Sequence, residues 1–271
     1  MERRTAIITG SASGLGRALA LRLARDGWRL ALADIDDVEN ARTLEAVQAA
    51  GGEGLCEHVD VSSVDDWRRL HDRLRAEWPR LDLLVNNAGV GGSGEVGVFT
   101  LDDWRFLIET NLMSVVYGCH IMLDWLKENP GRANICNISS IASQLSLPRM
   151  AAYCAAKSGV VKLSESLRVE LAAADVGVTV VCAGFFTSRL LERARMKTQY
   201  EHDFTALSMQ HSPLTADSVA EATLRAVARR RFFLAVTSWK IRGYWWFSRL
   251  APRAFMNYVT RVYLNDPPAY V

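Results

Sequence analysis

The sequence predicts an α/β fold: a doubly wound parallel sheet of about seven strands flanked by helices, in one domain with a C-terminal extension. Short apolar runs rich in β-branched residues alternate with longer segments of helical periodicity, which is the pattern of βαβ units. The length of 271 residues suits one such domain, and no internal repeat or low-complexity linker divides it. The composition, 49% hydrophobic and 23% charged, excludes a disordered chain, a fibrous repeat and a disulfide-stapled miniprotein.

Helix and strand signals follow one another in order along the chain. The segment 13–25 carries leucine at every fourth position, which covers one face of a helix. Asp102 and Thr215 are predicted N-caps, and Gly27 and Gly51 are predicted to end helices. The predicted strands are residues 5–9, 29–33, 54–58, 81–86, 133–138, 178–182 and 232–236, and the predicted helices lie near 15–26, 38–50, 65–77, 102–128, 151–174 and 215–230.

Five cysteines are widely spaced, with no CxxC pair and no Cys/His cluster at ligand spacing, so we expect no metal site. They are predicted to be mostly buried thiols in a reducing compartment. The N-terminal MERRTAIITG runs from two arginines into a strand and lacks the apolar stretch of a secretory signal. No run approaches the roughly 18 uncharged apolar residues of a spanning helix, so we expect a cytoplasmic protein without one. The cysteines are Cys56, Cys119, Cys136, Cys154 and Cys182.

A glycine-rich turn, TGSASGLG over residues 9–16, follows the first strand and opens a helix. Three glycines there let the backbone approach a pyrophosphate, which the helix N-terminus attracts; a tight turn with no ligand is the alternative. Asp34 ends the second strand, 18 residues after Gly16, where an acid accepts hydrogen bonds from an adenosine ribose. The alternative for Asp34 is a solvated turn acid. Neither Ser13 nor Ile35 is basic, which favours NAD over NADP.

Tyr153 and Lys157 lie four residues apart, and therefore on one face of a helix. A free phenol has a pKa of about 10, and a nearby cation lowers it toward the range of a useful base. Such a pair also occurs on ordinary surface helices. A functional site is indicated by the order in which four motifs occur along the chain: the glycine-rich turn, the Asn86–Gly89 segment, Ser139-Ser140, and the pair Tyr153 and Lys157.

With these motifs the chain resembles the short-chain dehydrogenase/reductase family, in the branch with the TGxxxGxG turn and the YxxxK pair, over roughly residues 5–236. The resemblance implies a Rossmann-like fold and the catalytic residues Asn111, Ser140, Tyr153 and Lys157, with Asn111 holding a water in a proton relay. Ser140 is preferred to Ser139 because it lies 13 residues before Tyr153. The implied cofactor residues are Thr9, Gly10, Ser13, Gly14, Leu15, Gly16, Asp34, Asp60, Val61, Asn87, Ala88, Gly89, Tyr153, Lys157, Gly184, Phe186 and Ser188.

The mechanism that the resemblance implies is hydride transfer between a substrate carbon and NAD. Tyr153 takes or gives the hydroxyl proton, Lys157 lowers its pKa and binds the nicotinamide ribose, and Ser140 stabilises charge on the substrate oxygen. One position departs from the family pattern. Ala183 stands where a proline is usual, while Gly184 is kept and Ser188 replaces a threonine. We expect the loss of proline to weaken cofactor affinity more than it changes the reaction.

A long segment after the sixth strand, residues 185–213, is rich in apolar side chains. We interpret it either as a lid over a hydrophobic substrate or as a helix pair packed on the body. Residues 91–97 hold four glycines and are predicted to be a flexible rim or an ordinary loop. The apolar residues of the segment are Phe185, Phe186, Leu190, Leu191, Met196, Tyr200, Phe204, Leu207 and Met209.

The net charge of +2 conceals two unlike parts. Residues 225–271 carry nine Lys and Arg and one acid, a net +8, whereas the first 224 residues carry 23 basic and 29 acidic groups, a net −6. Residues 239–271, which we separate from the domain at 1–238, hold nine aromatics among these cations. Three hypotheses remain open for this extension: peripheral contact with a membrane surface, closure of the pocket or a subunit contact, and nucleic-acid binding, which no motif supports.

We therefore predict an NAD-dependent enzyme that interconverts an apolar secondary alcohol and its ketone, or an alcohol and an aldehyde, with a steroid, retinoid or acyl-chain compound as substrate. The alternative is a catalytically idle relative that serves as a cofactor-binding scaffold or regulatory protein. The long apolar helices near 102–128 and 151–174 resemble those that pair in family dimers and tetramers, so a homo-oligomer is expected.

Overall fold

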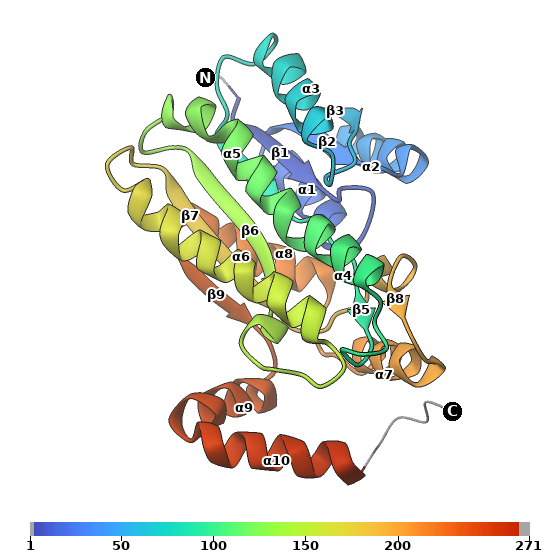
Figure 1. Ribbon diagram of the computed structural model, residues 1–271. Coiled ribbons are helices and arrows are strands. Elements are labelled where there is room, and N and C mark those ends of the chain that lie inside the picture. Colours follow the sequence, from blue (N-terminus) through green and yellow to red (C-terminus); the bar gives the residue numbers. More distant parts are fainter. Residues whose placement is uncertain (1–2, 266–271) are drawn as a thin grey trace.

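The computed structural model describes residues 3–265, and a seven-stranded sheet forms its centre. All its strands are parallel, in the order β3-β2-β1-β4-β6-β7-β9 (Figure 1). The chain winds outward from β1 on one side and from β4 on the other. The carboxyl ends of β1 and β4 therefore border a crevice. The strands are β1 (Thr5–Thr9), β2 (Arg29–Asp34), β3 (Glu53–His58), β4 (Leu83–Asn86), β6 (Asn134–Ser140), β7 (Gly177–Ala183) and β9 (Phe233–Val236).

Helices cover both faces of the sheet, and each layer encloses its own apolar core. Leu19 and Val219 lie in the core under the first layer, and Trp67, Met122 and Val160 lie in the core under the second. The first layer consists of α1 (Gly14–Arg25), α2 (Asp37–Ala49) and α8 (Ala216–Ala228); the second consists of α3 (Val64–Arg75), α4 (Leu101–Ile108), α5 (Ser114–Lys127) and α6 (Ala151–Glu170). The predicted doubly wound α/β class is confirmed.

The predicted strands and helices are present, with small shifts at their ends. β4 begins at Leu83 rather than at residue 81, because the Asp82 side chain accepts a hydrogen bond from the Thr5 amide at 2.8 Å. Gly27 and Gly51 follow α1 and α2 with φ of +77° and +84°, left-handed conformations that suit glycine after a helix.

Thr215 caps α8 as predicted, but the predicted N-cap Asp102 is wrong. Thr100 holds that position, because its hydroxyl accepts from the Asp103 amide while the Asp103 carboxylate accepts from the Thr100 amide. Asp102 lies in the first helical turn, where an acid faces the positive end of the helix dipole.

One helical run, Leu101–Lys127, is long and apolar enough to cross a membrane by length and composition alone. It comprises α4, the π-helical η1 (Glu109–Met113) and α5. Its side chains Val115 and Met122 are buried in the core beside the sheet. The run is therefore one of the helices that cover the sheet within this fold.

The remaining elements lie at the carboxyl edge of the sheet and beyond it (Figure 1). Residues 185–213 form η3 (Arg189–Leu191), β8 (Arg195–Met196) and α7 (Gln199–Gln210). β8 pairs with β5 (Gly92–Ser93), so part of the predicted flexible rim is fixed by a strand pair. After β6 comes the short η2 (Ile141–Ser143), and after β9 the helices α9 (Trp239–Leu250) and α10 (Pro252–Asn265).

Candidate active site

A cleft of about 460 Å³ opens at the carboxyl edge, at the crevice between β1 and β4. Its wall is formed by the turn after β1, the ends of β2, β4 and β6, the start of α6 and the segment after β7. Ligands in open α/β sheets bind at such a position. The sequence-predicted residues that line it are Gly10, Ser13, Gly14, Leu15, Asp34, Asp60, Val61, Asn87, Ala88, Gly89, Ser140, Tyr153, Lys157, Gly184, Phe186 and Ser188.

Three predicted residues, Thr9, Gly16 and Asn111, lie behind the cleft wall. The Thr9 hydroxyl accepts from the amides of Asn87 at 3.0 Å and Ala88 at 3.1 Å, which joins the two strands that border the crevice. Thr9, Gly16 and Asn111 therefore support the wall of the cleft and do not line its interior.

The glycines of the turn are required by its backbone. Gly10 and Gly14 have φ of +67° and +52°. Gly16 packs against the Gly10 carbonyl so closely that a Cβ there would overlap it, and the Asn87 amide nitrogen would be 2.7 Å away. Asn87 in turn donates to the carbonyls of Thr9 at 2.8 Å and Gly10 at 3.2 Å. The turn therefore has one compact conformation that a larger residue would disrupt.

The N-terminus of α1 points its first peptide groups toward the cleft. Its N-cap, Ser13, makes no side-chain capping hydrogen bond, although Ser13, Gly14 and Leu15 all line the cleft. Unpaired amides at a helix N-terminus, with the positive end of the helix dipole, form an anion site. A phosphate group is the ligand that these donors suit.

Asp34, at the end of β2, lies directly beside this turn, and two backbone amides donate hydrogen bonds to its carboxylate. Its Oδ2 accepts from the Ala12 amide and its Oδ1 from the Asp36 amide, both at 3.0 Å. These bonds fix the carboxylate at the mouth of the cleft. Each oxygen has a further lone pair for a ligand hydroxyl.

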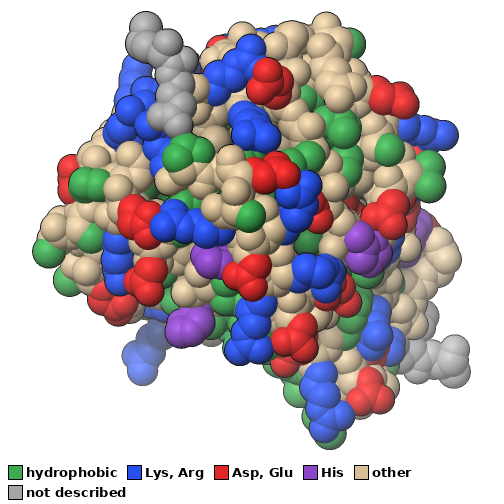
Figure 2. All heavy atoms as spheres, turned by 90° about the horizontal axis from the view of Figure 1, so that it is seen from above, with side chains coloured by type: hydrophobic (Ala, Val, Ile, Leu, Met, Phe, Trp, Pro, Cys, Tyr) green, Lys and Arg blue, Asp and Glu red, His purple; other side chains and the backbone are tan. Residues whose placement is uncertain are grey.

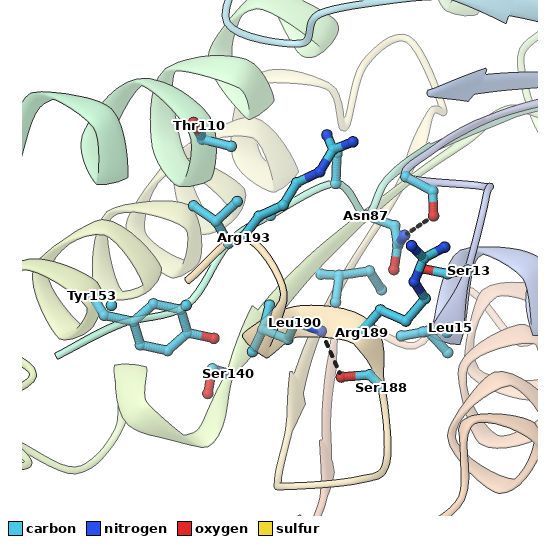
Figure 3. A pocket seen from close by; sticks show the side chains of 18 of the residues that line it. Ser13, Leu15, Asn87, Thr110, Ser140, Tyr153, Ser188, Arg189, Leu190 and Arg193 are labelled. Carbon is cyan, nitrogen blue, oxygen red and sulfur yellow. Dashed lines mark hydrogen bonds between the residues drawn. The ribbon is translucent and has the colours of Figure 1, made fainter. Parts of the chain in front are cut away.

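A basic side chain that sequence reasoning missed reaches the same rim. Arg189, in η3, lines the cleft and lies 3.7 Å from Asp36 and 3.9 Å from Glu39. Figure 3 shows its side chain on the same side of the cleft as Ser13, and both residues line it. Because Arg189 is 155 positions after Asp34, only the folded chain could reveal it.

Tyr153 and Ser140 both line the cleft and lie near one another in it (Figure 3). Ser140 ends β6, whereas Tyr153 lies in the first turn of α6, and the Ser140 hydroxyl is near enough to the phenol to act on its pKa. The neighbouring Ser139 instead donates to the Lys157 carbonyl at 2.8 Å. The geometry therefore favours Ser140 over Ser139 as the group that meets a substrate oxygen.

Burial determines the pKa values of the two titratable groups. It raises the pKa of Tyr153 to about 12, although the nearby Ser140 hydroxyl acts in the opposite direction. Burial also lowers the pKa of Lys157 to about 8. The ammonium lies 5.9 Å from the Tyr153 ring centre and donates to the Ile138 carbonyl at 3.2 Å. The predicted lowering of the phenol pKa by Lys157 is therefore not found in the protein chain alone, where burial raises that pKa.

Asn111 is fully buried in the π-helical segment, a type of helix defect that is frequent at functional sites. Its amide accepts from the Val90 amide at 3.1 Å and donates to the Val90 carbonyl at 3.0 Å. Both ends of the side chain are thus bonded to the backbone after Gly89. Its predicted role in a water relay stays a prediction.

In the segment after β7, some apolar side chains line the cleft and others are exposed on the surface. Phe185, Phe186, Leu190, Met196 and Met209 line the cleft. Tyr200, Phe204 and Leu207 are exposed. The first group supports the interpretation as a lid, and the second shows that α7 is not simply packed on the body. We call residues 185–213 the lid.

Ala183 stands where the family pattern has a proline, and the residues that follow it are held by hydrogen bonds. The Gly184 amide donates to the Val236 carbonyl at 2.8 Å, and a Cβ on Gly184 would meet Thr237 Oγ1 at 2.9 Å. Ser188 caps η3 through a hydrogen bond from the Leu190 amide (Figure 3). The loop is therefore anchored by β9 rather than by a proline.

Known proteins resemble the chain in sequence. A sequence family described as short chain dehydrogenase matches residues 4–199. "Probable oxidoreductase EphD" of Mycobacterium tuberculosis is 34% identical over 184 residues, which are 68% of this chain but only 31% of that protein. A "3beta-hydroxysteroid dehydrogenase" of Mediterraneibacter gnavus is 31% identical over 71% of this chain and 70% of its own length.

A solved structure is also similar. The short chain dehydrogenase/reductase from Burkholderia phymatum, in complex with NAD, superposes with a TM-score of 0.82 at 33% sequence identity. The match covers 86% of this chain and 89% of that one.

Proposed function

The chain belongs to the short-chain dehydrogenase family, and we propose that it is an oxidoreductase of CH–OH groups that interconverts an apolar secondary alcohol and its ketone, or an alcohol and its aldehyde, with NAD. One observation carries the proposal. A single cleft brings the glycine turn, Asp34, Ser140, Tyr153 and Lys157 together.

The cleft fits a nicotinamide dinucleotide by its own geometry. The close packing at Gly16 and the unpaired amides at the start of α1 suit a pyrophosphate, and Asp34 suits the adenosine ribose. Lys157, at the inner end, suits the nicotinamide ribose hydroxyls. The volume of about 460 Å³ lies within the usual range of small-molecule pockets.

The bound dinucleotide supplies the carbon that accepts or donates hydride. In the oxidation direction Tyr153 accepts the proton of the substrate hydroxyl, and in the reduction direction it donates a proton to the carbonyl oxygen. Ser140 hydrogen-bonds that same oxygen and stabilises its developing charge. With a pKa of about 12 in the chain alone, Tyr153 is protonated near neutrality, which is the form that reduction requires.

Lys157 makes cofactor binding depend on pH. Its pKa is lowered to about 8, so the ammonium is present below that pH and is lost above it. Because the ammonium is the stronger donor to ribose hydroxyls, we expect NADH affinity to fall as pH rises through this value. Fluorescence titrations at pH values on both sides of it measure the effect.

Lys157→Met is the control for this titration. We expect it to bind NADH more weakly and without the step in pH. A wild-type affinity that is constant across the series would contradict the role given to Lys157.

The substrate class follows from the lid. Phe186, Leu190, Met196 and Met209 line the cleft together with Leu147 and Met150, so much of its lining from the lid and from the segment before α6 is apolar. The name of the M. gnavus relative, a 3beta-hydroxysteroid dehydrogenase, supports a steroid among the apolar alcohols to be tried. Long-chain and retinoid alcohols share this chemistry.

NAD is the proposed cofactor because the Asp34 carboxylate would repel a 2′-phosphate. Arg189 acts in the opposite direction, but Asp36, Glu39 and Glu192 surround it with negative charge. We expect Asp34→Ala to lower the ratio of kcat/KM for NAD to that for NADP by about tenfold to a hundredfold, as one nearby charge allows. Removing Arg189 as well should reduce the NADP activity gained.

A turnover screen tests both the function and the cofactor. Wild type, Asp34→Ala and Asp34→Ala/Arg189→Ala are assayed with NAD and NADP on steroid, retinoid and long-chain alcohols and ketones. Activity of the wild type with NAD on at least one of them is expected. No turnover above a Lys157→Ala control with any of them would contradict the proposal and favour an idle scaffold.

Two further proposals concern assembly and location. We propose a homo-oligomer, supported by the family membership and by the exposed apolar residues Leu101 and Val169 on the two long helices. We propose a cytoplasmic location, supported by free thiols at all five cysteines, of which Cys119, Cys136 and Cys182 are buried.

A further inference from the structure

The hairpin formed by α9 and α10, residues 239–265, has an outer surface that the body of the protein does not cover. In Figure 1 the hairpin lies at one end of the molecule, after β9. Figure 2 shows the opposite end, where Lys and Arg side chains are interspersed with Asp and Glu. The hairpin differs from that surface in both charge and apolar content.

All the charge on the hairpin is positive. Residues 239–265 contain no Asp or Glu, and their five cations are exposed. Within the described part of the chain none of the five forms an ion pair, whereas Arg68, Arg73 and Arg105 on the body each have a carboxylate partner. The five are Lys240, Arg242, Arg249, Arg253 and Arg261.

The inner side of the hairpin explains how it is held. Phe255 is buried with Ile141 and Leu145, and Ile241, Trp245, Phe247 and Val259 pack around them. Ser238 caps α9, and Tyr244 stacks on Tyr258 between the two helices. The apolar side chains named here therefore form the contact between the hairpin and the body. The side chains on the outer surface of the hairpin are not part of this contact.

The outer side of α9 is apolar as well. Trp239, Trp246 and Leu250, at spacings of seven and four, lie on one face of the helix. Their exposed fractions are 79%, 55% and 79%. Three large apolar side chains in one stripe, flanked by Arg242 and Arg249, are unusual on a surface that meets only water.

We infer that this outer surface of the hairpin, Trp239, Trp246 and Leu250 with the five cations, lies on a lipid bilayer that contains anionic headgroups. Tryptophan rings prefer the headgroup level, and cations are attracted to anionic lipid. The helices have 12 and 14 residues, too few to span the hydrocarbon core, so they lie in the plane of the interface.

Charge favours lipid over a second copy of the chain as the occupant. A two-fold contact would bring the same surface of both copies together and would oppose five cations that have no carboxylate partner in the described residues with five more. An anionic bilayer complements that charge. Compared with a nucleic acid, it also accounts for the exposed aliphatic Leu250.

The hairpin is joined to the substrate end of the cleft. Tyr263, near the end of α10, donates to Glu95 in the rim. Arg149 lies over the rings of both Tyr263 and Tyr200, at 5.1 and 4.8 Å, and so connects α10 with the lid helix α7. If the proposed apolar substrate is correct, a bilayer on the hairpin would lie on the side of the molecule where α10 meets the lid.

Co-sedimentation of the full chain with vesicles tests the inference without any assay of activity, so its failure is distinct from failure of the proposed function. The vesicles are phosphatidylcholine alone or with about 30% phosphatidylserine. We expect binding to the anionic vesicles that weakens with added salt and is slight on the neutral ones.

Two triple variants separate the apolar and charged contributions. Trp239→Ser/Trp246→Ser/Leu250→Ser should abolish binding. Lys240→Gln/Arg242→Gln/Arg253→Gln should weaken it by about fivefold per cation, about a hundredfold in all. The matched controls on the body, Val38→Ser and Arg68→Gln/Arg105→Gln, should bind as wild type does. Unchanged NADH affinity in each variant shows that it is folded.

Two results would overturn the inference. The first is a wild type that does not sediment with anionic vesicles, or that binds neutral and anionic vesicles equally. The second comes from sedimentation velocity without lipid: an oligomer that the Trp239/Trp246/Leu250 variant dissociates, together with no vesicle binding, would assign the surface to a second copy of the chain.

Discussion

Tyr153→Phe should reduce kcat by about 10²–10⁴-fold, because it removes the group that exchanges a proton with the substrate oxygen. The ring remains to fill its buried position at the start of α6, so the fold should persist. The expected signature is a loss in kcat with NADH binding retained. Steady-state kinetics and a fluorescence titration of NADH measure the two quantities.

Tyr117→Phe is the matched control. It removes a phenol hydroxyl that donates to Glu109 at 3.2 Å, outside the cleft, and should leave kcat unchanged. A Tyr153→Phe enzyme with wild-type kcat would show that another group carries the proton. The assignment of Ser140 and Lys157 as its neighbours in catalysis would then fail as well.

Gly16→Ala should have the second largest effect, on cofactor affinity. The new Cβ would overlap the Gly10 carbonyl and lie 2.7 Å from the Asn87 amide nitrogen, so the turn must shift. We expect NADH affinity to fall by at least about tenfold, which is 1.4 kcal/mol. Overpacking should also lower the free energy of unfolding by about 1–3 kcal/mol.

Gly27→Ala separates these two effects. Gly27 has a φ of +77°, but a Cβ at this position would have no neighbouring atom within 4 Å, so alanine there meets strain and no clash. It should lower the free energy of unfolding by about 1–2 kcal/mol without weakening NADH binding. If Gly16→Ala changes affinity no more than Gly27→Ala, the turn does not contact the cofactor as proposed.

The sequence predicted the elements that depend on local signals. Leucine periodicity in 13–25 identified α1, and Gly27 and Gly51 marked real helix ends. The cap of α4 was misplaced by two residues, because Thr100 and Asp102 are both good capping residues and only the bonds to Asp103 distinguish them. Local chemistry therefore defines helices better than it defines their first residue.

The sequence predicted those residues of the candidate site that lie directly after strands of the parallel sheet. Parallel strands bring the turn after β1 and Ser140 at the end of β6 to one edge, so linear motifs converge there. The approach of Arg189 to Asp36 depends on the path of the lid, for which the sequence has no short-range signal. Likewise, only the folded structure shows which apolar side chains of the lid and of the hairpin face the body and which are exposed.

The most direct test of hydride transfer in this cleft is to follow deuterium from a substrate to the cofactor. An apolar secondary alcohol that the enzyme oxidises is labelled with deuterium at its carbinol carbon, and the NADH formed is analysed by mass spectrometry. We expect one deuterium in the reduced nicotinamide from wild type and no labelled product from Tyr153→Phe above background. Product ketone formed without deuterium in the NADH would contradict hydride transfer in this cleft.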